Sequence, residues 1–473
     1  MGKKNGAKGF IKNTLIFFVG TVLSKMVSFL MMPLYTEKVP TSQMGIFDTS
    51  VTLVTMLFSI CYFEIWSAAL RFLYSKEYST NKRGITQAGW KIFAVSTFIF
   101  SILCTIMCII MRYDYIYLVV GYGIATALSN QITFIARGVG LNKQFSISGI
   151  ISTLVHLSLN VLLLTVFDLD YSALYISFIA GVFAQVLFLG ICIKKSGRLT
   201  KSEDQDKKLL LKEMLKYALP LCLNTVSYWF LSSFNRVVYN SIFGNHASGI
   251  FSIGSRFGSI IALATTCFTY AWQDLAFSNA NNAEEERVEL YITACNKYQQ
   301  FLTATTAMLL PLLNLIFPIL VKGDYTDALS LVPSFVVVAV VSAYSSFIGN
   351  IFYAIKDTKI ISISTVISAI TNLAICYPLI RFWGGLGTNL ATIAAFILNI
   401  AVRAIVLKKK MKFNIKIKNI FLSSLWLLVT IFGYYINNVF VQAGILVFNV
   451  IIAFIMFKND IIKIFKPRSG DKK

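Results

Sequence analysis

Fourteen long apolar runs alternate with short polar segments along the 473 residues of the chain. Each run is close to the roughly 20 residues that a helix needs to cross the hydrocarbon core of a bilayer. The predicted spans are 13–34, 43–70, 90–111, 116–136, 147–167, 172–193, 214–235, 246–270, 300–321, 331–355, 359–380, 385–407, 419–438 and 441–457. The pattern therefore predicts an all-α polytopic membrane protein with about fourteen transmembrane helices.

The distribution of charge gives an independent test of this layout. Only 14% of the residues are charged, against roughly 25% in soluble domains, and 43 Lys and Arg stand against 21 Asp and Glu. If the N-terminus is cytoplasmic and the spans alternate, 36 of these 43 cations fall on the inner side. This matches the positive-inside rule and predicts that both termini are cytoplasmic. Because the cations lie between apolar runs, and not on one soluble face, nucleic-acid binding is not expected.

The polar linkers divide the spans into groups. The longest linker separates six spans from the rest, and a second basic linker at 407–418 separates the next six from a final pair. We predict an N-terminal six-helix lobe at 1–193, a basic cytoplasmic linker at 194–213, a C-terminal six-helix lobe at 214–407, and two further helices with a basic tail at 408–473. The sequences MGIFDTS at 44–50 and SGIFSIG at 248–254 echo each other. Parallel repeats of this kind predict a pseudo-twofold axis, with a substrate site between the lobes.

Ionisable residues inside apolar spans indicate where a polar pathway could lie, because such residues are costly in lipid and face a cavity or a partner. Lys25 lies near the middle of the first span, Arg256 lies inside the eighth, and Glu64 lies in the inner third of the second. These positions predict a cavity with cationic groups that binds an anionic substrate. The alternative is that Lys25 snorkels to the interface or pairs with Glu64.

Three further charged residues lie at span ends. Arg71 ends its span at the cytoplasmic side, where it either steers an anionic headgroup or only sets topology. Arg236 lies at the outer end of the seventh span, against the positive-inside trend, and is therefore a candidate substrate-binding residue. Asp48 is interpreted as an interfacial residue. His156, Asn160, Asn224 and Asn372 are interpreted as interhelical hydrogen-bond partners.

Several kinds of chemistry find no support in the sequence. The eight cysteines lack the paired spacing of a zinc site, so no metal is expected. No phosphate-binding loop is present, so no nucleotide cofactor is expected. The outer loops are too short to hold a catalytic site, which argues against an enzyme.

Several segments resemble the Wzx-type polysaccharide flippases of the multidrug/oligosaccharidyl-lipid/polysaccharide exporter superfamily. They are NTLIFFVGTVLSKMVSFLMMPLYTE near the start, AALRFLY at 68–74, KYALPLCLNTVSYWFLSSFNRVVYNSIFG at 216–244 and ASGIFSIGSRFGSIIALATTCFTYAWQDLAF at 247–277. The resemblance extends over essentially the whole chain. One departure is Asn235, where the family pattern leads us to expect Asp, and this puts an ion-coupling role there in doubt.

This resemblance implies two lobes around a central cavity that work by alternating access. The implied cargo is an oligosaccharide on undecaprenyl diphosphate, moved from the cytoplasmic to the outer leaflet of a bacterial plasma membrane. The final helix pair resembles the one that forms a groove for the lipid tail in MurJ-type lipid II flippases. A polysaccharide polymerase and assembly proteins are the implied partners. A drug or cation exporter of the same superfamily and, less well supported, a membrane glycan polymerase are the alternatives.

Overall fold

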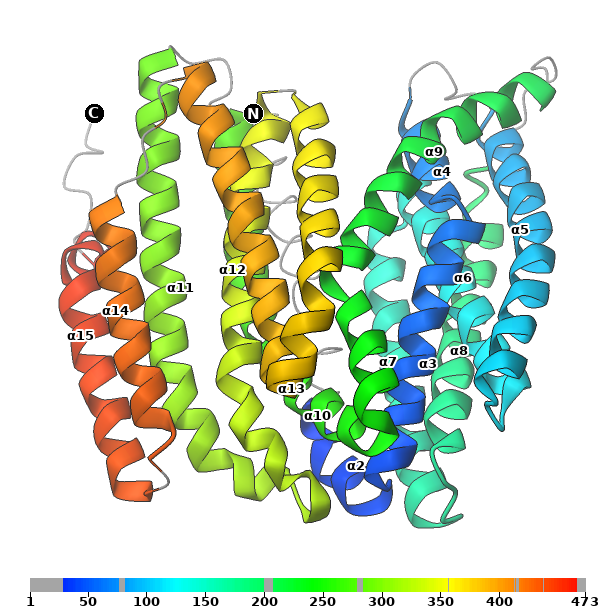
Figure 1. Ribbon diagram of the computed structural model, residues 1–473. Helices are drawn as coiled ribbons and strands as arrows, with labels where there is room; N and C mark the ends of the chain where they lie inside the picture. The colour runs from blue at the N-terminus through cyan, green and yellow to red at the C-terminus, as the bar shows by residue number, and fades with distance from the viewer. Residues whose placement is uncertain are drawn as a thin grey trace. The chain divides into compact units, whose positions relative to one another are not determined.

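The computed structural model describes residues 29–75, 81–199, 207–278, 284–355, 357–411, 413, 417–436 and 438–465. Within these ranges the regular elements are helices (Figure 1). Most of the first predicted span, including Lys25, lies outside the described residues. The elements are α2 (Met32–Lys38), α3 (Thr41–Cys61), α4 (Ile65–Tyr74), α5 (Lys82–Met111), α6 (Ile116–Gly138), α7 (Asn142–Thr165), α8 (Ser172–Ser196), α9 (Lys207–Ser232), α10 (Phe234–Ser278), α11 (Glu284–Leu320), η1 (Gly323–Leu331), α12 (Val332–Ala354), α13 (Thr358–Met411), α14 (Ile417–Tyr434) and α15 (Val439–Phe465).

The helices follow the apolar runs closely. From the second span onward, helical backbone covers nearly all of each predicted span. In the part of the chain that the structure describes, nine helices are long and apolar enough to cross a membrane. The eleventh and twelfth predicted spans are the two parts of α13, which are divided at Gly384 with φ 55°. Because a positive φ costs glycine little, the chain can turn there between two spans.

The second predicted span, at 43–70, is not one continuous helix. It is broken into α3 and α4 at Phe63 and Glu64, whose φ angles of 52° and 55° lie in the left-handed region. A non-glycine residue in this region costs on the order of 1–3 kcal/mol, so the surrounding packing must hold the break in place. Interrupted helices within a membrane are tolerated where they are buried in protein or line a cavity.

Packing divides the chain into two compact units. Unit 1 contains residues up to Ile253 together with Gly323–Tyr325 and Thr365–Ala395, and unit 2 contains Gly254–Lys322, Thr326–Ser364 and the chain from Phe396 onward. The borders of these packing units therefore differ from those of the lobes predicted at 1–193 and 214–407. The difference arises because α9, the start of α10 and the middle of α13 pack in unit 1. The two lobes stay a prediction.

Two glycines allow α3 and the start of α10 to touch through their backbones in unit 1. A Cβ added to Gly45 would collide with the carbonyl oxygen of Asn245, and one added to Gly249 would collide with the carbonyl oxygen of Thr41. Each glycine thus lies against the residue four positions before the other glycine. Gly45 and Gly249 are equivalent positions in the MGIFDTS and SGIFSIG echo. The contact is reciprocal, as a local twofold relation between the two segments requires.

In unit 2 the last two helices pack on α11, and Figure 1 shows α14 and α15 beside it. Asn449 on α15 donates to the backbone oxygen of Ala307 at 2.7 Å and accepts a hydrogen bond from Trp426 on α14 at 2.8 Å. Asn449 is 1% exposed, so both hydrogen bonds are formed away from solvent. Such interhelical bonds contribute roughly 0.6–2 kcal/mol each in a membrane protein. The final pair is therefore joined to unit 2 through specific polar contacts.

Candidate functional site

Arg236 forms an ion pair at one end of unit 1. Its Nη1 lies 3.2 and 3.3 Å from the two carboxylate oxygens of Asp48 on α3, and its guanidinium lies 6.0 Å from the ring centroid of Phe251. The side chains of Arg236 and Asp48 are 31% and 19% exposed, so the pair is partly shielded from solvent. Asp48 is thus the partner that neutralises Arg236, a role beyond its interpretation as an interfacial residue.

Glu64 lies at the break between α3 and α4. Its two carboxylate oxygens accept hydrogen bonds from the hydroxyls of Ser67 at 2.9 Å and Thr225 at 3.2 Å. Glu64 is half-buried, and no Lys or Arg of the described residues lies within ion-pair distance of it. Since it precedes the first turn of α4, the helix dipole favours its negative charge. The predicted alternative pairing with Lys25 falls outside the described residues.

Within unit 1, Arg71 and Glu64 do not gather around Arg236. Arg71 is exposed near the end of α4, beyond the break at Glu64. Asp48 and the end of α3 are separated by thirteen residues of helix, which is about 20 Å along the axis. Arg256 is half-buried on α10 in unit 2, where it interacts with its surroundings. The joint cationic cavity of Lys25, Arg71, Arg236 and Arg256 therefore stays a prediction.

A neutral network surrounds Asn235, at the position where the resemblance led us to expect an acid. Asn235 Nδ2 donates to the Asn372 side-chain oxygen at 3.0 Å, the Thr388 backbone oxygen at 3.1 Å and the Thr392 hydroxyl at 3.0 Å. Asn372 donates back to the Asn235 side-chain oxygen at 2.9 Å and to the Phe230 backbone oxygen at 2.9 Å. The predicted role of Asn372 as an interhelical partner is confirmed, whereas neither polar side-chain atom of the buried Asn160 has a hydrogen-bond partner among the described residues. All four side chains are at most 4% exposed, so this junction of α10 and α13 is a buried, uncharged one.

Arg403 is a buried cation that sequence reasoning did not single out. It is 5% exposed on α13 in unit 2, where it donates to the Ser364 hydroxyl at 2.9 Å and to the Ser345 backbone oxygen at 2.6 Å. Gly349 gives it room, because a Cβ there would lie 2.9 Å from its Nη1. The available signal is an arginine inside an apolar span, four residues before the predicted end of that span at 407. The positive-inside pattern counts Arg403 among the inner cations and does not distinguish it from the lysines that follow.

The turn from α5 to α6 and the turn from α7 to α8 meet through two acids in unit 1. Tyr115 donates to Asp170 at 2.7 Å, and Tyr171 donates to Asp114 at a longer 3.4 Å. Burial favours the protonated form of Asp170, but hydrogen bonds from Ser172 and Tyr115 outweigh it and hold the pKa of Asp170 below its ordinary value. Asp170 therefore stays ionised at neutral pH, and this end of the unit carries fixed negative charge.

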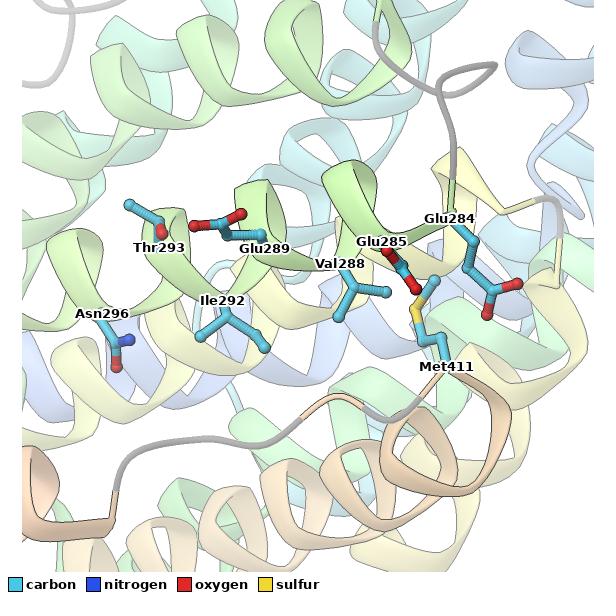
Figure 2. A pocket seen from close by; sticks show the side chains of 8 residues that line it. All are labelled: Glu284, Glu285, Val288, Glu289, Ile292, Thr293, Asn296 and Met411. Carbon is cyan, nitrogen blue, oxygen red and sulfur yellow. The ribbon is translucent and has the colours of Figure 1, made fainter.

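A cavity of about 670 Å³ lies in unit 2, at the start of α11 (Figure 2). Glu284, Glu285 and Glu289 line it, and the side chain of Met411 lies beside Glu285. These acids belong to the first two turns of α11, ahead of the predicted span at 300–321, where the helix dipole favours negative charge. Their placement is thus explained by the helix terminus ahead of the predicted apolar span.

Comparison with known proteins defines the class first. The chain has the fold of an inward-facing multidrug resistance MATE family transporter, with TM-score 0.59, 12% identity and coverage of 82% of this chain and 96% of that one. It also has the fold of lipid II flippase MurJ in an inward closed conformation, with TM-score 0.68, 16% identity and coverage of 95% and 100%. A mutant of the Vibrio cholerae MATE transporter VcmN gives TM-score 0.56, 13% identity and coverage of 85% and 97%. The chain is therefore a polytopic all-α membrane protein with the fold of transporters and flippases, not of an enzyme.

The family follows from the sequence itself. Residues 10–272, more than half of the chain, match the family described as "Polysaccharide biosynthesis protein". The chain belongs to this family. No curated protein sequence matches the chain.

Proposed function

We propose that this protein is a flippase that moves a polyprenyl-diphosphate-linked oligosaccharide from the cytoplasmic to the outer leaflet by alternating access, for export of a cell-surface polysaccharide. Membership of the polysaccharide biosynthesis family supports a role in making such a glycan. The transporter fold supports movement of a substrate across the membrane. A bacterial plasma membrane, cytoplasmic termini and association with a polymerase and assembly proteins belong to the same proposal.

The observation that favours a lipid-linked cargo over a drug concerns the C-terminal helix pair. The MurJ comparison covers 95% of this chain, so the part left uncovered is shorter than the 27 residues of α15, and the likeness includes at least part of that helix. The MATE comparisons cover less of the chain, from 82% to 89%. The larger coverage by a structure named as a lipid flippase supports the lipid-linked cargo.

The charged residues give this proposal its mechanism. Lys25, Arg71 and Arg256 would bind the diphosphate or an acidic sugar, because cations at membrane depth persist where they serve a pathway. Arg236 would join them when its ion pair with Asp48 opens. Glu64, placed at an interrupted helix, would line the same route and accept hydrogen bonds from sugar hydroxyls.

Reconstituted protein provides the test. Proteoliposomes containing a fluorescent undecaprenyl-diphosphate oligosaccharide would report how fast the sugar becomes exposed on the far leaflet, for wild type, Lys25→Ala and Arg256→Ala at matched reconstitution. We expect each variant to slow flipping by roughly tenfold or more, because a hydrogen bond to a charged group contributes about 1.5–3 kcal/mol. Lys143→Ala is the matched control, since Lys143 is an exposed cation at the start of α7.

Two results would contradict parts of the proposal. Equal rates for wild type and both variants would leave flipping intact and remove the two cations from the mechanism. No acceleration over protein-free liposomes, with a full set of ion gradients, would favour the exporter alternative.

A further inference from the structure

Unit 1 contains a second cavity, of about 260 Å³, at the end that the positive-inside pattern assigns to the outer side. It lies between α3, the turn from α5 to α6, and the first segment of α10. The side chains of Arg112, Asp114 and Asn245 are exposed at the cavity, while Thr49 of α3 is buried. The cavity is thus open to solvent on one side and closed by helix packing on the other.

The amides of Asn240 and Asn245 line this cavity and keep unused hydrogen-bonding groups. Both hydrogens of the Asn240 amide are engaged, with the Asn245 side-chain oxygen at 2.9 Å and the Ser248 hydroxyl at 3.0 Å. This arrangement fixes the orientation of both amides. Among the described residues, the side-chain oxygen of Asn240 and the side-chain nitrogen of Asn245 then have no partner. One acceptor and two donors are available to a ligand.

Two charged side chains of the same lining are also free to bind. Arg112 caps α5 with φ 55°, a left-handed conformation that an arginine adopts only at a cost of about 1–3 kcal/mol. In the described part of the chain no ion pair joins Arg112 to Asp114 or to another acid. Asp114 accepts only the long 3.4 Å hydrogen bond from Tyr171. Arg112 and Asp114 are thus a cation and an anion of one lining that no printed ion pair occupies.

The size and chemistry of the lining select the class of ligand. Drug-sized ligands occupy pockets of roughly 300–1,000 Å³, and this cavity is smaller, with a lining that combines apolar side chains with two charged groups and two amides. A phosphate would meet the carboxylate of Asp114, with the ionised Asp170 close by in the adjoining turn. A sugar ring fits better. Carboxylate, amide and guanidinium groups bind adjacent hydroxyls as both donors and acceptors, and Tyr113 supplies an aromatic side chain in the same lining.

We infer that this cavity is a binding subsite for a single sugar ring of the transported glycan on the outer side, formed by Arg112, Asp114, Asn240 and Asn245. The inference rests on the proposed function, and adds to it a contact with the carbohydrate itself, separate from the diphosphate. The site holds a neutral or amino sugar weakly, because the cavity is small and only four polar side chains are available to bind the hydroxyls. Weak binding suits a site from which the glycan must leave.

Direct binding of free sugars tests this inference without a transport assay. Purified protein in nanodiscs free of sugar-based detergent would be mixed with methyl α-glucoside, methyl α-galactoside and methyl N-acetyl-α-glucosaminide, and saturation-transfer NMR would follow binding. We expect saturable binding of at least one glycoside in the millimolar range. Asp114→Asn and Asn245→Ala should each raise its Kd about fivefold or more, since one lost hydrogen bond is worth about 1 kcal/mol. Asp168→Asn is the control, because Asp168 is an exposed acid outside the lining, paired with Lys38 at 3.3 Å.

The outcomes separate this inference from the proposed function. Absence of saturable binding for every glycoside, or equal affinities in wild type and in variants that unfold at the same temperature as wild type, would overturn the subsite. Neither result depends on a lipid-linked substrate, so the proteoliposome assay tests flipping independently of the sugar subsite. Binding that is lost in both site variants and kept in Asp168→Asn would establish the subsite even if the lipid-linked cargo proved to be another one.

Discussion

Asn235 illustrates how a single residue determines the electrostatics of a buried junction. Its amide nitrogen is surrounded by three oxygen acceptors, and its own oxygen receives the amide of Asn372. An acid at this position would place a carboxylate oxygen against the Asn372 side-chain oxygen and the Thr388 backbone oxygen, which have no proton to give, and against the Thr392 hydroxyl, whose proton already bonds Thr388. The neutral amide shares its two N–H groups among the three oxygens and buries no charge, which would be costly in a low-dielectric interior.

Replacing Asn235 by Leu should therefore destabilise unit 1. The change removes the donor to the Asn372 side-chain oxygen and the acceptor of the Asn372 amide, at about 1–3 kcal/mol for each unsatisfied group, whereas the Thr392 hydroxyl keeps its hydrogen bond to Thr388. We expect a loss of at least about 2 kcal/mol, visible as a lower unfolding midpoint in detergent. Thr371→Val is the control, because the Thr371 hydroxyl is exposed and bonds only within its own helix, to Ile367. Equal effects of the two substitutions would contradict a structural role for the network.

The sequence indicated which residues are unusual, but not which residues they meet. Arg236 was recognisable because it lies against the charge trend, and Asn372 because an amide within an apolar span needs a partner. The Arg236–Asp48 pair joins residues 188 positions apart, and that proximity depends on how helices pack. Lys25 lies outside the described residues, and the roles of Arg71, Arg256 and Glu64 in binding stay predictions.

At the level of helices, the apolar runs predicted the elements well because length and hydrophobicity are encoded locally. The division of α13 at Gly384 was predictable for the same reason, since a glycine pair interrupts the run there. The break at Phe63 and Glu64 was not, because neither glycine nor proline marks it and neighbouring helices must hold two left-handed residues in place. The similar sequences at the start of the second and eighth predicted spans did not by themselves predict that α3 contacts α10. The backbone positions in the structure show this contact.

The close backbone contacts that Gly45 and Gly249 allow between α3 and α10 predict that stability is sensitive to a single added methyl group. Ala at either position should lower the unfolding midpoint, because the added carbon meets backbone, which cannot rotate away, and overpacking costs about 1–3 kcal/mol. Gly149→Ala on α7 is the matched control. A Cβ at Gly149 has no neighbour within 4 Å, and Ala is favoured over Gly in a helix by up to about 1 kcal/mol. Stability that stayed unchanged in Gly45→Ala and Gly249→Ala would show that α3 and α10 do not touch in the membrane.

At the scale of the whole molecule, the charge asymmetry predicts an orientation. Lys143 at the start of α7 should face the cytoplasm, and Asp168, just beyond its other end, should face outward. The 24 residues of α7 span about 36 Å, enough to cross the bilayer. In intact cells an impermeant maleimide should label Asp168→Cys but not Lys143→Cys, and lysis should expose the second. Wild type controls for the native cysteines, and the opposite labelling pattern would invert the proposed orientation and place the sugar subsite inside.

The Asn235 network also sets an order for biogenesis. Thr392 follows Asn235 by 157 residues, a length that takes roughly 8–31 s to synthesise at about 5–20 residues per second. During that interval the amide of Asn235 has already entered the translocation machinery or the bilayer without the acceptors that α13 will supply. Until α13 is synthesised, the start of α10 must either stay near water or bind a temporary partner. Insertases and chaperones that shelter polar groups in half-made membrane proteins would therefore meet this chain at α10, well before its last helices emerge from the ribosome.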